Sequence, residues 1–123
     1  MTQLIDITAF VTLYSAGDNA QIDKDAILKP IYDLAGVRNV ALAEEEITDG
    51  DEHAITITVN PRAFVGDNYW STFDGEDADP IDIVEEFLAD VRFDTTLEVV
   101  LEQASDVITA EVASAFELEE VAA

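Results

Sequence analysis

The only histidine, His53, follows two carboxylates, Asp51 and Glu52, and such a group is the kind from which a general base is built. A general base also needs a nucleophile within hydrogen-bond reach, and here that nucleophile would have to come from elsewhere in the chain. The chain has no cysteine, which excludes thiolate catalysis and cysteine-ligated zinc. We therefore expect His53 to be a surface histidine of a hairpin without a catalytic role.

The sequence lacks the common catalytic motifs. It contains no nucleophile elbow, no P-loop, no dinucleotide-binding glycine pattern and no H-E-x-x-H zinc motif. Two carboxylates can hydrolyse a glycosidic bond, but with 28 acidic residues the spacing of any one pair is uninformative. We expect a protein that is not an enzyme and that needs no cofactor.

The acidic segment 74–79 offers the oxygen ligands that calcium prefers. Its spacing is not that of an EF-hand loop, because the alternating ligands and the bidentate glutamate at the twelfth position are missing. We expect a solvated acidic loop with weak, nonspecific cation association and no specific metal site.

Acidic residues outnumber basic residues by 28 to 5, which gives a formal net charge of −23 on 123 residues. This charge makes compaction costly through self-repulsion and repels nucleic acids and anionic membranes. The cations are too few and too scattered to form a phosphate-binding groove, so we expect no direct nucleic-acid binding and no membrane binding. They are Lys24, Lys29, Arg38, Arg62 and Arg92.

Two settings select a surface of this kind. In molar salt the Debye length falls to about 3 Å, so the repulsion is screened while the carboxylates hold water. In ordinary salt, carboxylates can imitate DNA phosphates and occupy the basic groove of a DNA-binding protein. The scarcity of lysine favours the first setting. The sequence thus predicts a non-enzymatic interaction or assembly protein adapted to high salt, with a viral or accessory subunit as the example, whose partner is a basic protein surface or identical subunits.

Five aromatic residues are the predicted contact residues. Tyr69, Trp70 and Phe73 lie among turn residues, and large rings are good interface anchors when they are exposed. The alternative that they cap the open end of the core stays open, because large aromatics are usually well buried. Phe10 and Tyr14 belong to a predicted strand that is either covered on both faces or forms an edge that meets a partner.

A DNA-mimic inhibitor is the alternative function. It predicts carboxylates in one or two stripes on a single face, whereas salt adaptation predicts an even spread. Acidic residues are dense at 44–52, 74–86 and 117–120. The candidates for phosphate mimicry are Glu44, Glu45, Glu46, Asp49, Asp51, Glu52, Asp74, Glu76, Asp77, Asp79, Asp82, Glu85 and Glu86.

The elements that would hold these residues begin with a strand, because apolar and more polar residues alternate from Ile5 to Tyr14. A helix is predicted next, with Asp23 as its N-cap and Gly36 after its end, although Pro30 inside it is unfavourable.

Residues 37–59 predict a β-hairpin that turns at Asp49-Gly50. A two-residue turn there would place Leu42 opposite Ile57 and Val40 opposite Val59.

The second half begins with a helix that Asp79 caps and whose buried stripe runs from Ile83 to Val91. Residues 93–101 fit a strand and a helix equally well by periodicity, and their threonines and valines favour the strand. A helix capped at Ser105 would then form the alanine- and glutamate-rich tail.

The resulting order predicts one α+β domain over 1–123, with a ferredoxin-like split β-α-β-β-α-β sheet, an additional C-terminal helix and a tail that frays over 117–123. The alternative is a three-stranded sheet with a long C-terminal helix. No signal peptide or membrane span is visible, which predicts a soluble protein that is cytoplasmic or virion-associated.

Overall fold

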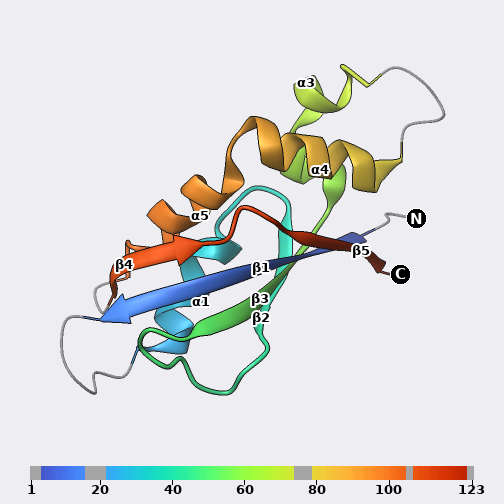
Figure 1. The fold of residues 1–123 in the computed structure, drawn as a ribbon. Helices are drawn as coiled ribbons and strands as arrows, with labels where there is room; N and C mark the ends of the chain where they lie inside the picture. The colour runs from blue at the N-terminus through green and yellow to red at the C-terminus, as the bar shows by residue number, and fades with distance from the viewer. Residues whose placement is uncertain (1–3, 16–21, 74–78, 105–106, 122–123) are drawn as a thin grey trace.

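The computed structural model describes residues 4–15, 22–73, 79–104 and 107–121, which form one five-stranded antiparallel sheet and five helices (Figure 1). The strands are β1 (Leu4–Ser15), β2 (Val37–Leu42), β3 (Glu52–Val59), β4 (Val107–Val112) and β5 (Glu117–Val121). The helices are α1 (Lys24–Tyr32), α2 (Pro61–Val65), α3 (Asp67–Trp70), α4 (Pro80–Asp90) and α5 (Phe93–Leu101).

The long strand β1 organises the sheet, whose order is β2-β3-β1-β4. One side of β1 pairs with β3, and the other side pairs with β4 near Ser15 and with β5 near Leu4. The predicted α+β class is confirmed. The predicted element order is not found, because four helices separate β3 from β4 and two strands end the described chain.

The core lies on one face of the sheet. Odd-numbered residues of β1 from Ile5 to Leu13 are fully buried, whereas the even-numbered residues between them are half-buried. The same alternation runs along β3, where Ile55, Ile57 and Val59 are buried. This period of two follows from strand geometry, in which successive side chains point to opposite faces. The half-buried residues lie on the face of the sheet that no described helix covers.

Two helices start where the sequence predicts. The side chain of Asp23 accepts a hydrogen bond from the Asp25 N–H (3.1 Å), and that of Asp79 accepts one from the Ile81 N–H (3.1 Å). Helix α1 ends at Tyr32, before the predicted end at Gly36, and it accommodates Pro30 in its interior. Gly36 has φ +77, and a Cβ there would lie 2.4 Å from the Phe64 backbone nitrogen.

The predicted hairpin between β2 and β3 is present with a different register. Leu42 lies opposite Ile55, and Val40 lies opposite Ile57, so each pair differs by two residues from the prediction. The cause is the loop 43–51, which is longer than a two-residue turn because the apolar side chain of Ile47 is buried in the core. A shift of two keeps the same residues on the buried face.

The strand predicted over 93–101 is wrong, since this segment is helix α5. Its buried residues recur at helical spacing, while Thr95 and Val99, which a strand would place beside them, are exposed. Packing against the sheet therefore overrides the β-propensity of threonine and valine. The buried residues of α5 are Phe93, Leu97, Val100 and Leu101.

The C-terminal helix is also wrong, both as a helix after residue 105 and as the longer alternative. Strands β4 and β5 occupy this region, because the free side of β1 presents backbone groups that a strand satisfies along its length. The predicted cap Ser105 lies outside the described residues. The segment 117–123, predicted to fray, provides β5 over Glu117–Val121.

Candidate interaction surface

The outer edge of β4 is closed by two carboxylates, one in α5 (Glu98) and one at its C-cap (Glu102). The N–H of Ala113 donates to the C=O of Phe10 (2.9 Å), so the N–H groups of Val112 and Ala110 point away from β1 in an antiparallel ladder. Val112 N–H donates to Glu98 Oε2 (2.9 Å), and Ala110 N–H donates to Glu102 Oε2 (3.0 Å). The two outward donors of this edge are therefore satisfied inside the molecule.

The spacing of these two bonds follows from helix and strand geometry. Positions i and i+4 of a helix are separated by a rise of about 6 Å, and positions i and i+2 of a strand by about 6.8 Å. Glu98 and Glu102 therefore face alternate amides of a strand that runs along the helix. The sequence prediction missed this pair because it treated the segment as a strand, in which the i, i+4 relation has no meaning.

The outer edge of β5 is protected by charge. Leu118 lies opposite Ile7, an odd-numbered residue of β1, so its backbone N–H points away from β1. Glutamates occupy three of the five positions of this strand, and all three are exposed. Edge charges of this kind oppose the addition of another strand.

The outer edge of β2 differs from both. The N–H of Ala43 donates to the C=O of Ala54 (3.0 Å), which makes Val40 and Leu42 the residues whose backbone groups point outward. Within the described ranges, no side chain accepts a hydrogen bond from the N–H of either residue. The Tyr32 hydroxyl donates to Asn39 Oδ1 (2.7 Å) and lies 3.4 Å from the Val40 C=O.

The single hydroxyl proton of Tyr32 is directed to the nearer acceptor, Asn39, so the Val40 C=O keeps accepting capacity. Strand β2 contains no carboxylate, and its only charged residue is the exposed Arg38 at a register shift between Val37 and Asn39. This edge is therefore open and free of acidic residues in a chain where acids prevail.

The predicted contact residues Phe10 and Tyr14 lie on the uncovered face of the sheet. Strand β1 is internal, so these rings do not mark an edge. Phe10 is half-buried, and Tyr14 is exposed. Phe10 has Thr8 and Thr12 as its neighbours on this face of β1, and Thr56 of β3 lies opposite Thr8.

The other predicted aromatics form a cluster at the far end of the helical layer. Tyr69 stacks with Phe73 at 5.3 Å and Phe87 at 5.1 Å between ring centroids, and its hydroxyl donates to Asp90 Oδ2 (2.7 Å). Burial first, and then the hydrogen bond to Asp90, raise the pKa of Tyr69 to about 12. Trp70 and Phe73 are half-buried against the core.

His53 is buried, with 4% of its surface exposed, so the expected surface position is wrong. The reason is its register, which places it on the inward face of β3 with Ile55. Its Nε2 accepts from the Thr48 N–H (2.9 Å), and its Nδ1 lies 3.3 Å from Glu44 Oε2. The ring therefore holds the loop 43–51 against the sheet.

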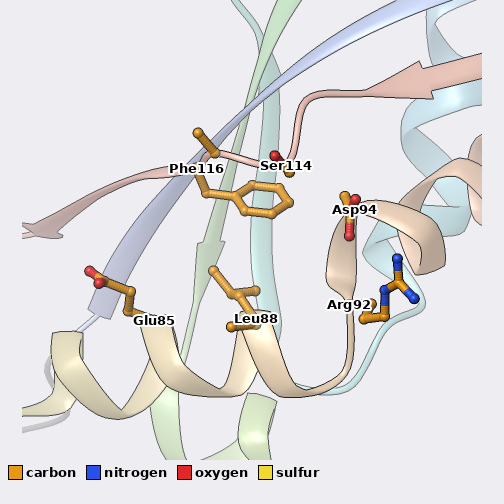
Figure 2. Close-up of a pocket in the computed structure, with 8 residues that line it drawn as sticks. Glu85, Leu88, Arg92, Asp94, Ser114 and Phe116 are labelled. Carbon is orange, nitrogen blue, oxygen red and sulfur yellow. The ribbon is translucent and has the colours of Figure 1, made fainter.

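A cavity of about 510 Å³ lies between α4, the start of α5 and the link from β4 to β5 (Figure 2). Phe116 and Leu88 form its apolar wall, and Arg92 stands at the beginning of α5 in a left-handed conformation (φ 52). Its lining combines two carboxylates, one guanidinium and one hydroxyl, and among the described residues no hydrogen bond joins the Ser114 hydroxyl to either carboxylate. The polar residues are Glu85, Arg92, Asp94 and Ser114.

The carboxylates proposed for phosphate mimicry separate into two groups. Those of 44–52 lie on the loop and start of β3, and those of 79–86 lie at α4, on the opposite side of the view in Figure 1. All described members are exposed, although Asp49 accepts a hydrogen bond from the Ser15 N–H (2.7 Å). The candidates Asp74, Glu76 and Asp77 lie outside the described residues.

Among the residues with a described position, no group of three or more histidine, aspartate or glutamate side chains is arranged to hold a metal ion. The described helices are also too short or too polar to cross a bilayer. The chain matches no protein-family model, and comparison with curated proteins and with solved structures finds no significant similarity.

Proposed function

We propose that this chain is a non-enzymatic interaction and assembly protein that binds another protein by strand addition at the open edge of β2. The observation that carries the proposal is the contrast between edges: α5 carboxylates cap β4, glutamates line β5, and β2 has neither. Native proteins protect edges that must stay unpaired, so an edge without protection is the one available for pairing.

The physical basis of strand addition is the backbone. The outward N–H groups of Val40 and Leu42 and the Leu42 C=O would pair with an extended segment of the partner, which supplies affinity through main-chain hydrogen bonds. Side chains at alternate positions then supply specificity. The partner is a protein with a basic surface, which the acidic surface attracts, or an identical subunit, whose like charge concentrated salt screens.

A displayed library of short random peptides tests the edge. Peptides that bind are expected to be rich in β-branched and basic residues, and Leu42→Pro should abolish their binding by removing one outward N–H. The matched control is Leu118→Pro, because Leu118 is also a half-buried leucine of an edge strand with an outward N–H. Loss of binding in both variants, or in neither, contradicts the proposal.

Adaptation to concentrated salt is the proposed setting for this function. The net charge of −23 should make the free energy of unfolding rise steeply from dilute buffer to about 1 M potassium chloride, where the Debye length is about 3 Å. Thermal unfolding at several salt concentrations measures this rise. A chain that is fully stable in dilute buffer would instead favour the DNA-mimic function.

We also propose that the sheet is a variant of the ferredoxin-like split β-α-β-β-α-β arrangement. Support comes from α1, which joins two strands, β1 and β2, that lie on either side of β3. In this variant the fourth strand is divided into β4 and β5, and four helices replace the second single helix. An experimentally determined structure with a different strand order would overturn this assignment.

A further inference from the structure

We propose that the chain that adds to β2 is a second copy of the same protein, paired antiparallel about a two-fold axis at Ala41. This inference rests on the proposed function of the β2 edge and names its partner. It requires that the same strand be complementary to itself, which is the condition for a closed two-fold dimer.

The backbone fixes the register of this pairing. Only Val40 and Leu42 direct their N–H and C=O groups outward from the regular part of β2. An antiparallel pair uses all of these groups when Val40 of one copy lies opposite Leu42 of the other. Ala41 then lies opposite Ala41 at a non-hydrogen-bonded position, where Cα atoms approach to about 4.5 Å and a small side chain is favourable.

The charges next to this centre are complementary. Continuing the register by three residues from Ala41 places Arg38 of one copy opposite Glu44 of the other, and the two-fold axis repeats the pair. Arg38 is exposed and forms no ion pair within the described residues. The side chain of Glu44 remains 46% exposed beside His53, so its carboxylate is accessible to a second cation.

Antiparallel pairing of two copies at the β4 or β5 edge is unfavourable. Two β5 strands would bring glutamates together, because Glu117, Glu119 and Glu120 occupy most of that strand. Strand β4 has its outward Ala110 and Val112 N–H groups already bonded to α5. The β2 edge is thus the one at which two copies meet through uncharged and oppositely charged residues, and salt should strengthen the dimer by screening the remaining repulsion.

Sedimentation velocity at the lowest potassium chloride concentration that supports the dimer, where introduced charges are least screened, tests it with a pair of variants at its axis. Ala41 is exposed, so Ala41→Glu and Ala41→Lys remove no core packing. Each variant alone places like charges directly opposite and should weaken the dimer about tenfold or more. An equimolar mixture should restore dimers, because glutamate then faces lysine across the axis.

Charge reversal tests the register. Arg38→Glu should weaken the dimer several-fold, and the double variant Arg38→Glu/Glu44→Arg should restore it. The matched control is Arg92→Glu, which changes the net charge equally at the N-cap of α5, outside the sheet, and should leave the dimer unchanged. Circular dichroism of every variant establishes that it is folded.

A protein that stays monomeric from dilute to molar salt overturns the second copy as partner, while the peptide experiment still decides whether the edge binds other chains. A dimer that Ala41→Glu leaves intact places the interface elsewhere and overturns the inference. Equal effects of Arg38→Glu and Arg92→Glu contradict the register. Recovery in both the mixture and the double variant supports the inference in full.

Discussion

The outer edges of β4 and β2 differ in whether their outward backbone N–H groups are hydrogen-bonded. At β4, Glu98 and Glu102 accept hydrogen bonds from two outward N–H groups of the strand, whereas at β2 the outward N–H groups of Val40 and Leu42 have no acceptor within the described part of the chain. The difference shows that abundant carboxylates do not protect an edge by their number. At β4, protection depends on the helical segment that holds two carboxylates in register with the strand.

The largest expected effect comes from opening the closed edge. Glu98→Ala combined with Glu102→Ala leaves the Ala110 and Val112 N–H groups without acceptors. The double variant should lower the free energy of unfolding by about 3–6 kcal/mol, since each hydrogen bond to a charged group contributes about 1.5–3 kcal/mol. Urea denaturation at fixed salt measures the loss.

The matched control for this variant is Glu98→Gln combined with Glu102→Gln. It makes the same change in net charge but keeps an acceptor oxygen on each side chain. A loss as large as that of the alanine variant would show that charge, and not the capping of the edge, explains the effect.

Amide exchange should distinguish the two edges directly. The N–H groups of Ala110 and Val112 are hydrogen-bonded, so they should exchange about a hundredfold more slowly than those of Val40 and Leu42 in the monomer. Residue-resolved hydrogen exchange by NMR provides the measurement. Equal protection at both edges in dilute protein would remove the contrast on which the proposed function depends.

The aromatic cluster provides a reference that is remote from both edges. Because the pKa of Tyr69 is raised from 10.0 to about 12, the folded state retains this proton where the unfolded chain has lost it. The resulting stability is complete below pH 10.0 and is lost as the pH rises toward 12. Denaturation measured across this pH range should show the loss of stability, and Tyr69→Phe should make that loss smaller. Amide hydrogen exchange at Val40 and Ala110 should not change in this variant.

The smallest effect should come from Tyr32→Phe. Removing the hydroxyl frees the Asn39 side chain at the open edge, so self-association should increase by roughly twofold. Sedimentation velocity at constant salt measures the change. A weaker dimer would mean that the hydroxyl helps to form the contact instead of competing with it.

The reliable part of the sequence prediction concerns segments where local signals and burial agree. Asp79 and Pro80 start α4 as predicted, and the alternation in β1 correctly identifies its buried face. Val91 was predicted in the buried stripe but is 41% exposed, because the chain turns at Arg92 before that position reaches the sheet.

The edge contrast was not predictable from the sequence, for a physical reason. Whether residues 93–101 form a strand or a helix depends on which partner covers them, and periodicity fits both. If residues 93–101 formed a strand, Glu98 and Glu102 would not accept hydrogen bonds from a neighbouring strand. The sequence would then contain no feature that distinguishes one edge of the sheet from another. The register of β2 was similarly set by the burial of Ile47 in its loop, a tertiary event.

The capping bonds also have a consequence for the order of folding. They join residues that are 14 and 8 positions apart, whereas β4 must find a partner in β1 about a hundred residues earlier in the chain. Short loops close first, so we expect α5 and β4 to assemble as a local unit before the strand reaches the sheet. Early protection of the Ala110 and Val112 amides in pulse-labelled refolding would reveal that unit. Strand β4 would then join the sheet with its outer side already occupied, so that its other side is the one left to pair with β1.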